Sequence, residues 1–412
     1  MSRIKIAAAL ILLALIFVVI FTAPGFFWDI ACWKEWAIHI KQQGLRNAYK
    51  STTDYLPLYQ YELWLYGKIM GTEQAIDRNI ALLKIVTLFF DVVGLWFVYK
   101  WIDKKVDFLL VFIFCAINAG YLYNSIIWGQ VDGIFATLIF ISLYYGHNNQ
   151  TLLSAVFFLL VLNFKLQAIV FLPVWGLLCL NNMVSKPDVK NILLPVLAMV
   201  LLECLILFPF FLSGDSGEVL RVVRQSVGKY PLITIGAKNI WSFVLDGHTD
   251  HVPDTGVWFG GVTYNKAGLY MFFIASFIAL LPLINISLKN MKNRTGEPYK
   301  IAKERLWLIC ALVITCFYFF NTQMHDRYAH PAFIFIIAYA FYTRNVFPLI
   351  LFSVAYFLTL EDFLHYLKLP NYKTLIFDDM FIAGLYAILI GYLFVKLFSR
   401  PPAGKGYNNL TA

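Results

Sequence analysis

The chain alternates apolar runs with short polar connections, and these runs give the first prediction. A helix needs roughly 20 residues to cross the hydrocarbon core of a bilayer, and several of the runs are shorter than that. Twelve candidate segments cover residues 5–22, 80–101, 108–123, 132–146, 151–163, 168–181, 191–212, 268–288, 306–320, 331–342, 346–360 and 380–398. The pattern predicts an all-α polytopic membrane protein with about twelve transmembrane segments. Residues 1–400 form one domain, and the tail at 401–412, which contains Gly, Asn and Pro, is expected to be flexible and cytoplasmic.

The composition supports this class. Hydrophobic residues make up 60% of the chain and charged residues only 14%, whereas a soluble domain carries about a quarter charged residues. The net charge of +9 could indicate nucleic acid as a partner. The Lys and Arg residues lie mostly between apolar runs, where positive charge orients helices, so we expect the lipid bilayer and no nucleic acid as a partner.

The basic loops also set the predicted topology. The run from Ile6 to Thr22 is interpreted as an uncleaved first helix. Residues 151–181 fit either one long tilted helix or two short helices that meet at 163–167. One helix would place the basic loop 289–305 outside the cell, against the usual preference of Lys and Arg for the cytoplasmic side. Two helices predict a cell-membrane protein with both termini in the cytoplasm. Its outer segments are then 24–79, 124–131, 164–167, 213–267, 321–330 and 361–379.

The first outer loop, residues 24–79, has a helical pattern. Trp33, Trp36, Ala37 and Ile40 recur at helical spacing after Asp29, which favours an amphipathic helix with its tryptophans at the membrane boundary. A second, aromatic segment from Leu58 to Gly67 is typical of another surface helix. Together they are expected to form a shelf over the lipid.

Polar clusters collect at the outer ends of the predicted helices. The sequence from Trp128 to Asp132 places an amide and a carboxylate between two apolar runs. Such groups are costly at a membrane unless they are solvated or used, so they mark a functional site by default. A transporter more often carries such groups at mid-membrane, in two halves that resemble each other. The one-sided distribution favours an enzyme working at the interface.

The motifs and their order resemble the GT-C fold glycosyltransferases. The nearest resemblance is to the bacterial branch related to the second mannosyltransferase of glycosylphosphatidylinositol anchor synthesis. The resemblance spans residues 29–330 and rests on Asp29 after the first helix, Asp54-Tyr-Leu-Pro-Leu-Tyr, Trp128-Gly-Gln-Val-Asp-Gly, Asn163-Phe-Lys-Leu-Gln, Met324-His-Asp-Arg-Tyr and the stretch from Tyr230 to Trp241. The sequence departs from the family at Asp326, where the family usually has Glu.

The resemblance implies transfer of a sugar from a polyprenyl-phosphate-linked donor to an acceptor hydroxyl at the extracytoplasmic face. The sugar would be mannose, and the acceptor a lipid, a glycan or a protein. This reaction requires a base for the acceptor proton and donors that hold the departing phosphate. No cofactor is expected.

The carboxylates each have two interpretations. The family places its catalytic Asp just after the first helix, so Asp29 is the candidate general base, and Asp132 is a second catalytic candidate. Asp54, the second choice for the base, is grouped with substrate binding. Each of the three could instead be the N-cap of the helix that follows it.

Cations are expected to hold the phosphate. Arg327 can grip two phosphate oxygens through its planar fork, whereas Lys165 is a point charge that could simply extend to the headgroups. The expected donor and phosphate contacts are Lys165, Gln167, Arg327, His325 and Tyr328. The remaining candidate substrate contacts are Tyr55, Gln130, Trp128, Asn239 and Trp241. His325 and His330 fit no usual metal-ligand spacing, so no metal site is predicted, and hydrogen bonding to sugar or phosphate is favoured.

Two other functions remain open. A transporter of lipids or lipid-linked sugars is one. The other is a polymerase or ligase of lipid-linked glycans, a class that usually carries paired arginines in a large outer loop. Arg221 and Arg224 lie in such a loop.

Overall fold

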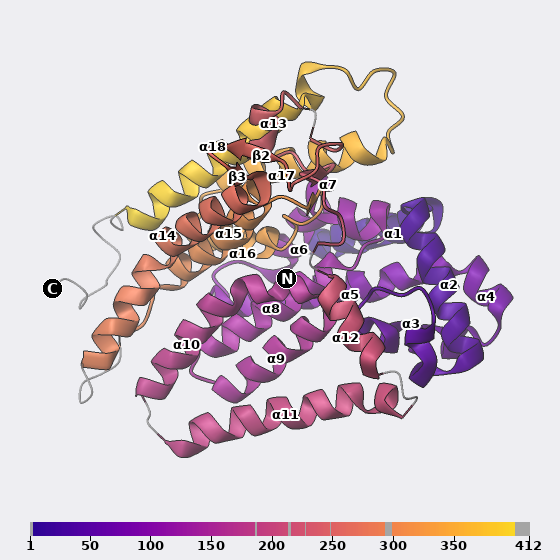
Figure 1. The fold of residues 1–412 in the computed structure, drawn as a ribbon, viewed down its shortest axis with the longest axis horizontal. Helices are drawn as coiled ribbons and strands as arrows, with labels where there is room; N and C mark the ends of the chain where they lie inside the picture. Colours follow the sequence, from indigo (N-terminus) through magenta and orange to yellow (C-terminus); the bar gives the residue numbers. More distant parts are fainter. Residues whose placement is uncertain are drawn as a thin grey trace.

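The chain is almost entirely helical. The computed structural model describes residues 3–185, 188–212, 216–226, 228–247, 249–292 and 299–399 (Figure 1). The predicted flexible tail, 401–412, lies outside the described residues. Every one of the twelve apolar runs forms helix, so the all-α prediction is confirmed.

The first half of the chain contains α1 (Arg3–Thr22), α2 (Phe27–Gln43), η1 (Leu45–Lys50), α3 (Pro57–Met70), α4 (Glu73–Arg78), η2 (Ile80–Leu82), α5 (Leu83–Trp101), α6 (Phe108–Ala116), α7 (Ala119–Leu122), η3 (Tyr123–Trp128), α8 (Asp132–His147), α9 (Thr151–Phe164), η4 (Leu166–Phe171), α10 (Leu172–Ser185) and α11 (Val189–Phe211). The second half contains α12 (Ser216–Gln225), β1 (Thr234–Ile235), α13 (Ile240–Val244), β2 (Val257–Phe259), β3 (Val262–Thr263), α14 (Tyr264–Lys292), α15 (Lys303–Phe320), β4 (Met324–His325), α16 (Ala332–Thr343), α17 (Phe347–Leu364), η5 (Leu375–Phe377) and α18 (Asp379–Phe398).

Several of these helices are long and apolar enough to cross a membrane. Among the described residues seven qualify, and the bent pair Phe108–Ala116 and Ala119–Trp128, with a 76° angle between its parts, would make eight. Two further apolar helices, α9 and α16, have only 14 and 12 residues. The long apolar helices indicate a multi-pass membrane protein.

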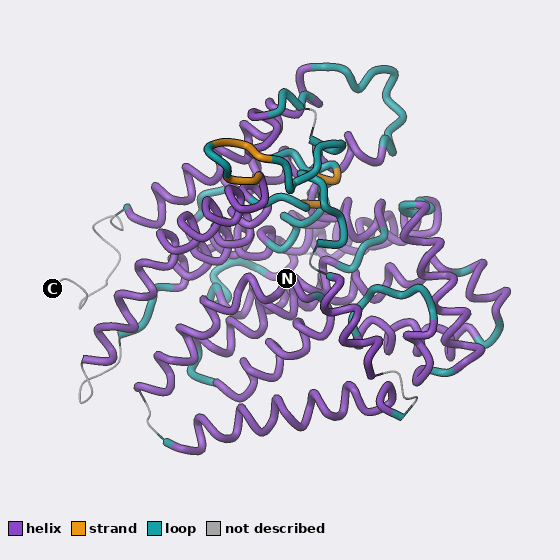
Figure 2. The backbone as a smooth tube through the Cα atoms, viewed as in Figure 1, coloured by secondary structure: helices purple, strands orange, loops and turns teal. Residues whose placement is uncertain are grey.

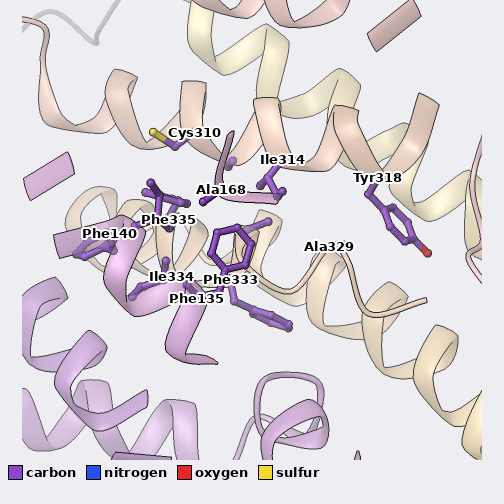
Figure 3. Close-up of a cluster of buried hydrophobic side chains, with 14 of the residues drawn as sticks. Phe135, Phe140, Ala168, Cys310, Ile314, Tyr318, Ala329, Phe333, Ile334 and Phe335 are labelled. Atoms are coloured by element: carbon purple, nitrogen blue, oxygen red, sulfur yellow. The ribbon is translucent and has the colours of Figure 1, made fainter. Parts of the chain in front are cut away.

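The protein core is formed by helices that are buried all round. Ten consecutive residues of α15, from Leu306 to Thr315, are buried, and so are most residues of α8 and α16. Figure 3 shows their aromatic and aliphatic side chains meeting, with Phe135, Ile314 and Phe333 close together. In contrast, α1 and α11 leave most of their apolar side chains uncovered. A helix that is apolar all round is buried in protein or in lipid, and both cases occur here.

The stretch from 151 to 181 is a hairpin of two helices. Lys165 adopts an extended conformation (φ −146°, ψ 121°) that ends α9. Trp175 of α10 donates a 3.0 Å hydrogen bond to Ser154 and stacks on Phe158, with ring centroids 4.5 Å apart. In a continuous helix, Phe158 and Trp175 would be separated by about 25 Å. The predicted break is therefore confirmed. Figure 1 shows α9 between α8 and α11, consistent with its contacts to both.

The two predicted helices of the first outer loop exist, but their orientation differs from the prediction. Trp33 and Trp36 on α2 are 1% and 3% exposed. Trp33 packs against Tyr59 of α3, and Trp36 against Tyr55. The expectation that these tryptophans lie at the lipid boundary is wrong, because α3 and the preceding turn supply aromatic partners for this face.

The loop between α11 and α14 is attached to the segment before α16. β1 pairs in parallel with β4, so Thr234 lies beside Met324 and Ile235 beside His325. Lys238 is buried and forms ion pairs with Asp362 and Asp379. Figure 2 shows the four short strands and much of the irregular chain together in one region of the molecule. This arrangement fixes the position of the residues that follow Met324.

Candidate functional site

Asp132 is the centre of a buried charged cluster. Its side chain pairs with Lys165, lies 3.7 Å from Nε of Arg327 and accepts a 3.1 Å hydrogen bond from Asn124. The three partners come from η3, the α9–η4 connection and the β4–α16 connection. Val131, not Asp132, is the N-cap of α8, and it makes no side-chain cap bond. The N-cap interpretation of Asp132 is therefore wrong.

Asp29 forms a second part of the same cluster. Its carboxylate accepts a 2.7 Å hydrogen bond from Trp128 Nε1 and another from the Gln130 amide. The helix α2 begins two residues earlier, and its N-cap is Phe26 without a side-chain cap bond. The cap interpretation is wrong here as well. Unlike Asp132, Asp29 is only half-buried.

A π-helical turn places Trp128 and Gln130 on Asp29. The backbone N–H groups of Gly129 and Gln130 both donate to the carbonyl of Asn124, at 3.0 and 2.9 Å. Gly129 has a φ of 88°, and a Cβ at this position would lie 3.1 Å from Cε of Lys84. Both constraints favour glycine. The turn at Gly129 therefore allows the side chains of Trp128 and Gln130 to reach Asp29 on α2.

Arg327 is held between aromatic rings. Its guanidinium carbon lies 5.1 Å from the ring centroid of Trp128 and 5.8 Å from that of Tyr328. Nζ of Lys165 lies 5.8 Å from the same tyrosine ring. Cation–π contacts of this kind hold a planar guanidinium in a fixed orientation. Tyr328 therefore contacts both candidate phosphate-binding cations.

His325 and Asp326 form a hydrogen-bonded pair beside Arg327. The His325 ring contacts the Asp326 carboxyl through Nδ1 and the Arg327 guanidinium at 2.8 Å through Nε2. Burial and the Arg327 charge hold the pKa of His325 well below its ordinary value, and burial raises the pKa of Asp326 well above its own. Both shifts favour the uncharged forms of the two side chains.

Tyr55 links the first outer loop to this cluster. Its hydroxyl donates a 3.3 Å hydrogen bond to the Gln130 side chain. Its ring lies against Trp36 and Tyr59. The structure thus brings together nine of the residues predicted from sequence: Asp29, Tyr55, Trp128, Gln130, Asp132, Lys165, His325, Arg327 and Tyr328.

Four predicted residues lie outside these contacts. Asp54 forms an ion pair with Lys229 of the long loop. It does not cap α3, whose N-cap is Leu56. Gln167 is half-buried, and no hydrogen bond joins its side chain to the described residues. Asn239 caps α13 and also donates to the carbonyl of Asn321, while the Trp241 indole donates to the carbonyl of Phe320 at 3.0 Å. These last two residues attach the long loop to the end of α15.

Sequence reasoning missed three members of the cluster, Asn124, Tyr356 and Phe363. Asn124 donates to Asp132 and, at 3.0 Å, to the hydroxyl of Tyr356, which in turn donates to the backbone carbonyl of Arg327. Phe363 stacks on Trp128 with 5.2 Å between centroids. The signal for Asn124 was an amide directly after the apolar run 108–123, four residues before Trp128. No local signal marks Tyr356 or Phe363, because both are ordinary aromatic residues of an apolar helix.

The described residues contain no group of three or more His, Cys, Asp or Glu side chains arranged to hold a metal ion. No family model matches the chain, and no curated protein matches it significantly. The fold and the site therefore define a helical multi-pass membrane protein with a buried, charge-balanced cluster at helix ends, and any narrower assignment rests on that cluster.

Proposed function

We propose that the chain is an integral membrane glycosyltransferase of the GT-C type. It would move a sugar, mannose by the resemblance, from a polyprenyl-phosphate-linked donor to an acceptor hydroxyl. The observation that carries the proposal is that Lys165 and Arg327, from distant segments, meet at Asp132, while Trp128 contacts both Arg327 and Asp29. A half-buried aspartate in the same cluster as two cations offers a base and phosphate ligands, which sugar transfer from a phosphate needs.

Asp29 serves as the general base in this proposal. Hydrogen bonds from Trp128 and Gln130 fix the direction of its carboxylate, and its half-buried position leaves access for an acceptor hydroxyl. A base placed in this way takes the proton as the glycosidic bond forms. Asp132 is a weaker candidate for this role, because it is buried and already engaged by two cations.

Arg327 and Lys165 stabilise the departing phosphate. Negative charge grows on the phosphate oxygens as the sugar leaves, and fixed cations in a water-poor site stabilise that charge strongly. The planar guanidinium of Arg327 can bind two phosphate oxygens. The aromatic rings of Trp128 and Tyr328 hold this guanidinium in place. Asp132 balances both cations before the donor binds, which keeps the empty site stable.

The same proposal includes twelve membrane crossings, cytoplasmic termini and an extracytoplasmic site. This topology is supported by contacts between loops that it assigns to the same side of the membrane. Among the segments predicted to lie outside, Lys229 meets Asp54, and β1 pairs with β4. Among those predicted to lie inside, Lys303 pairs with Asp103, and His147 contacts the carbonyl of Ile301.

The deciding experiment is an assay of the purified protein with a panel of polyprenyl-phosphate sugars, in which release of polyprenyl phosphate is measured. Asp29→Asn keeps the hydrogen-bonding oxygen but cannot take a proton, so we expect transfer to fall by about a hundredfold or more while donor binding persists. Asp54→Asn, the matched control on an exposed carboxylate, should retain most of the activity. A fully active Asp29→Asn protein would exclude Asp29 as the base.

The assay also separates the other classes. A transporter would move the lipid-linked sugar without releasing polyprenyl phosphate. A ligase built on Arg221 and Arg224 has less support, because Arg221 is engaged by Glu218 and Gln225 of its own helix. No observation favours either alternative over the transferase.

A further inference from the structure

We propose that the β-hairpin of residues 257–263 inserts into the membrane leaflet at the N-terminal end of α14, and that it anchors the candidate site to the lipid surface. The hairpin consists of β2 and β3, joined by Gly260 and Gly261. Both glycines have positive φ values, 54° and 80°. Two such residues form the tight turn that matches the twist of paired strands, so the tip is a defined structure.

The hairpin presents apolar side chains outward. Phe259 is 78% exposed, Val257 63% and Trp258 43%. The sequence from Thr255 to Tyr264 contains no charged residue. Large apolar groups gathered at an exposed tip mark a surface that contacts lipid or another apolar partner.

Its position identifies lipid as that partner. The hairpin leads directly into α14, which is long and apolar enough to span a membrane and whose Tyr270, Phe273 and Ile274 are exposed. The exposed tip is therefore only a few residues from a helix whose own apolar side chains are uncovered, which favours the same lipid environment for both. Tryptophan and other aromatic residues are enriched at the boundary between hydrocarbon and headgroups.

The hairpin is firmly joined to the body of the protein. The backbone N–H of Tyr264 donates to the carbonyl of Gly256 at 3.0 Å. The Trp258 ring lies edge-on to the buried ring of Trp241, with 5.6 Å between centroids. A movement of the tip relative to the protein would break these contacts, so insertion fixes the height of the surrounding loop above the membrane.

The base of the hairpin also holds the chain that enters the charged cluster. Asp254 accepts hydrogen bonds from Thr322 at 3.0 Å and from Gln323 at 2.8 Å. Two residues after Gln323 comes His325. The lipid anchor and the cluster therefore share one short hydrogen-bonded support, which keeps the cluster at a constant depth near the headgroups whatever its chemistry.

Photocrosslinking tests this proposal without reference to activity. The photoreactive amino acid p-benzoylphenylalanine would replace Phe259 in the full chain, reconstituted in phosphatidylcholine vesicles. Phe273 on α14 is the positive control, and His251, which is exposed in the same loop and polar, is the negative control. After illumination, mass spectrometry measures the fraction of protein that carries one added phospholipid.

We expect the Phe259 variant to yield lipid adducts within about twofold of the Phe273 variant, and the His251 variant at least tenfold fewer. Because Phe259 is exposed, its replacement should not disturb folding, and the gel-filtration profile checks this. Lipid adducts at Phe273 but not at Phe259 would overturn the proposal. So would a crosslink from Phe259 to a second copy of the chain in place of lipid.

Discussion

The substitution Asp132→Asn tests the most buried electrostatic feature of the molecule. It removes one negative charge and leaves Lys165 and Arg327 without their shared partner, in a place where their side chains are 13% and 9% exposed. The Asn124 hydrogen bond can persist, since Asn retains a carbonyl oxygen. Breaking a buried pair by removing one partner costs about 3–5 kcal/mol. For a chain of this size, that corresponds to a fall in melting temperature on the order of 5 °C.

The assay is thermal unfolding in detergent, followed through the fluorescence of the 11 tryptophans. Asp54→Asn breaks an ion pair whose side chains are 37–38% exposed, and an exposed pair contributes less than about 1 kcal/mol. This control should melt close to the parent protein. Adding Lys165→Met to Asp132→Asn removes one unpaired cation and should recover part of the loss. If Asp132→Asn melts within a degree of the parent, the charged cluster does not stabilise the fold as argued.

Three further predictions concern the site, the pH dependence and the topology. Arg327→Lys keeps the charge but loses the fork, so the rate of donor use should fall ten- to a hundredfold, about 1.5–3 kcal/mol; unchanged donor kinetics would remove Arg327 from the site. Burial raises the pKa of Glu62 on α3 from its ordinary value of 4.5 to about 8. Between pH 4.5 and about 8 the folded protein therefore binds more protons than the unfolded chain does. The free energy of unfolding consequently falls as the pH rises through this range. Glu62→Gln should therefore melt with the parent near pH 5 and above it at pH 9, and a difference independent of pH would contradict the buried carboxyl. For the topology, cysteine at Gln74 should react in intact cells with a membrane-impermeant thiol reagent above the parent level, and cysteine at Lys104 should not; the reverse pattern would invert the proposed orientation.

The sequence predicted the helices well because apolar periodicity and length are local properties. It also predicted the break at Lys165, since the charge of a distant loop excluded the single helix. It did not distinguish α15, which is buried in protein, from α11, which is largely uncovered, because both contain an apolar run of suitable length and the run alone does not show what covers it. The same limit explains the error at Trp33 and Trp36, whose pattern suits a lipid surface or a protein surface.

The candidate site was predictable in membership more than in geometry. The predicted topology placed Asp29, Asp132, Lys165 and Arg327 on one face, and the family resemblance selected them as site residues. The cap interpretations failed because an N-cap is recognised from neighbouring residues, whereas these carboxylates bind partners far away in the chain. Asn239 and Trp241 lie in a conspicuous motif, yet their contacts attach a loop to the end of α15.

The pairing of β1 with β4 sets an order for the assembly of the protein. These strands stand before and after α14 and α15, so they can pair only when both helices have been synthesised and have folded back on each other. Asp132 and Lys165 are separated only by α8 and α9 and can meet much earlier. A nascent chain can therefore pair Asp132 with Lys165 locally and acquires Arg327 last, so that the complete cluster exists only after α14 and α15 have been synthesised.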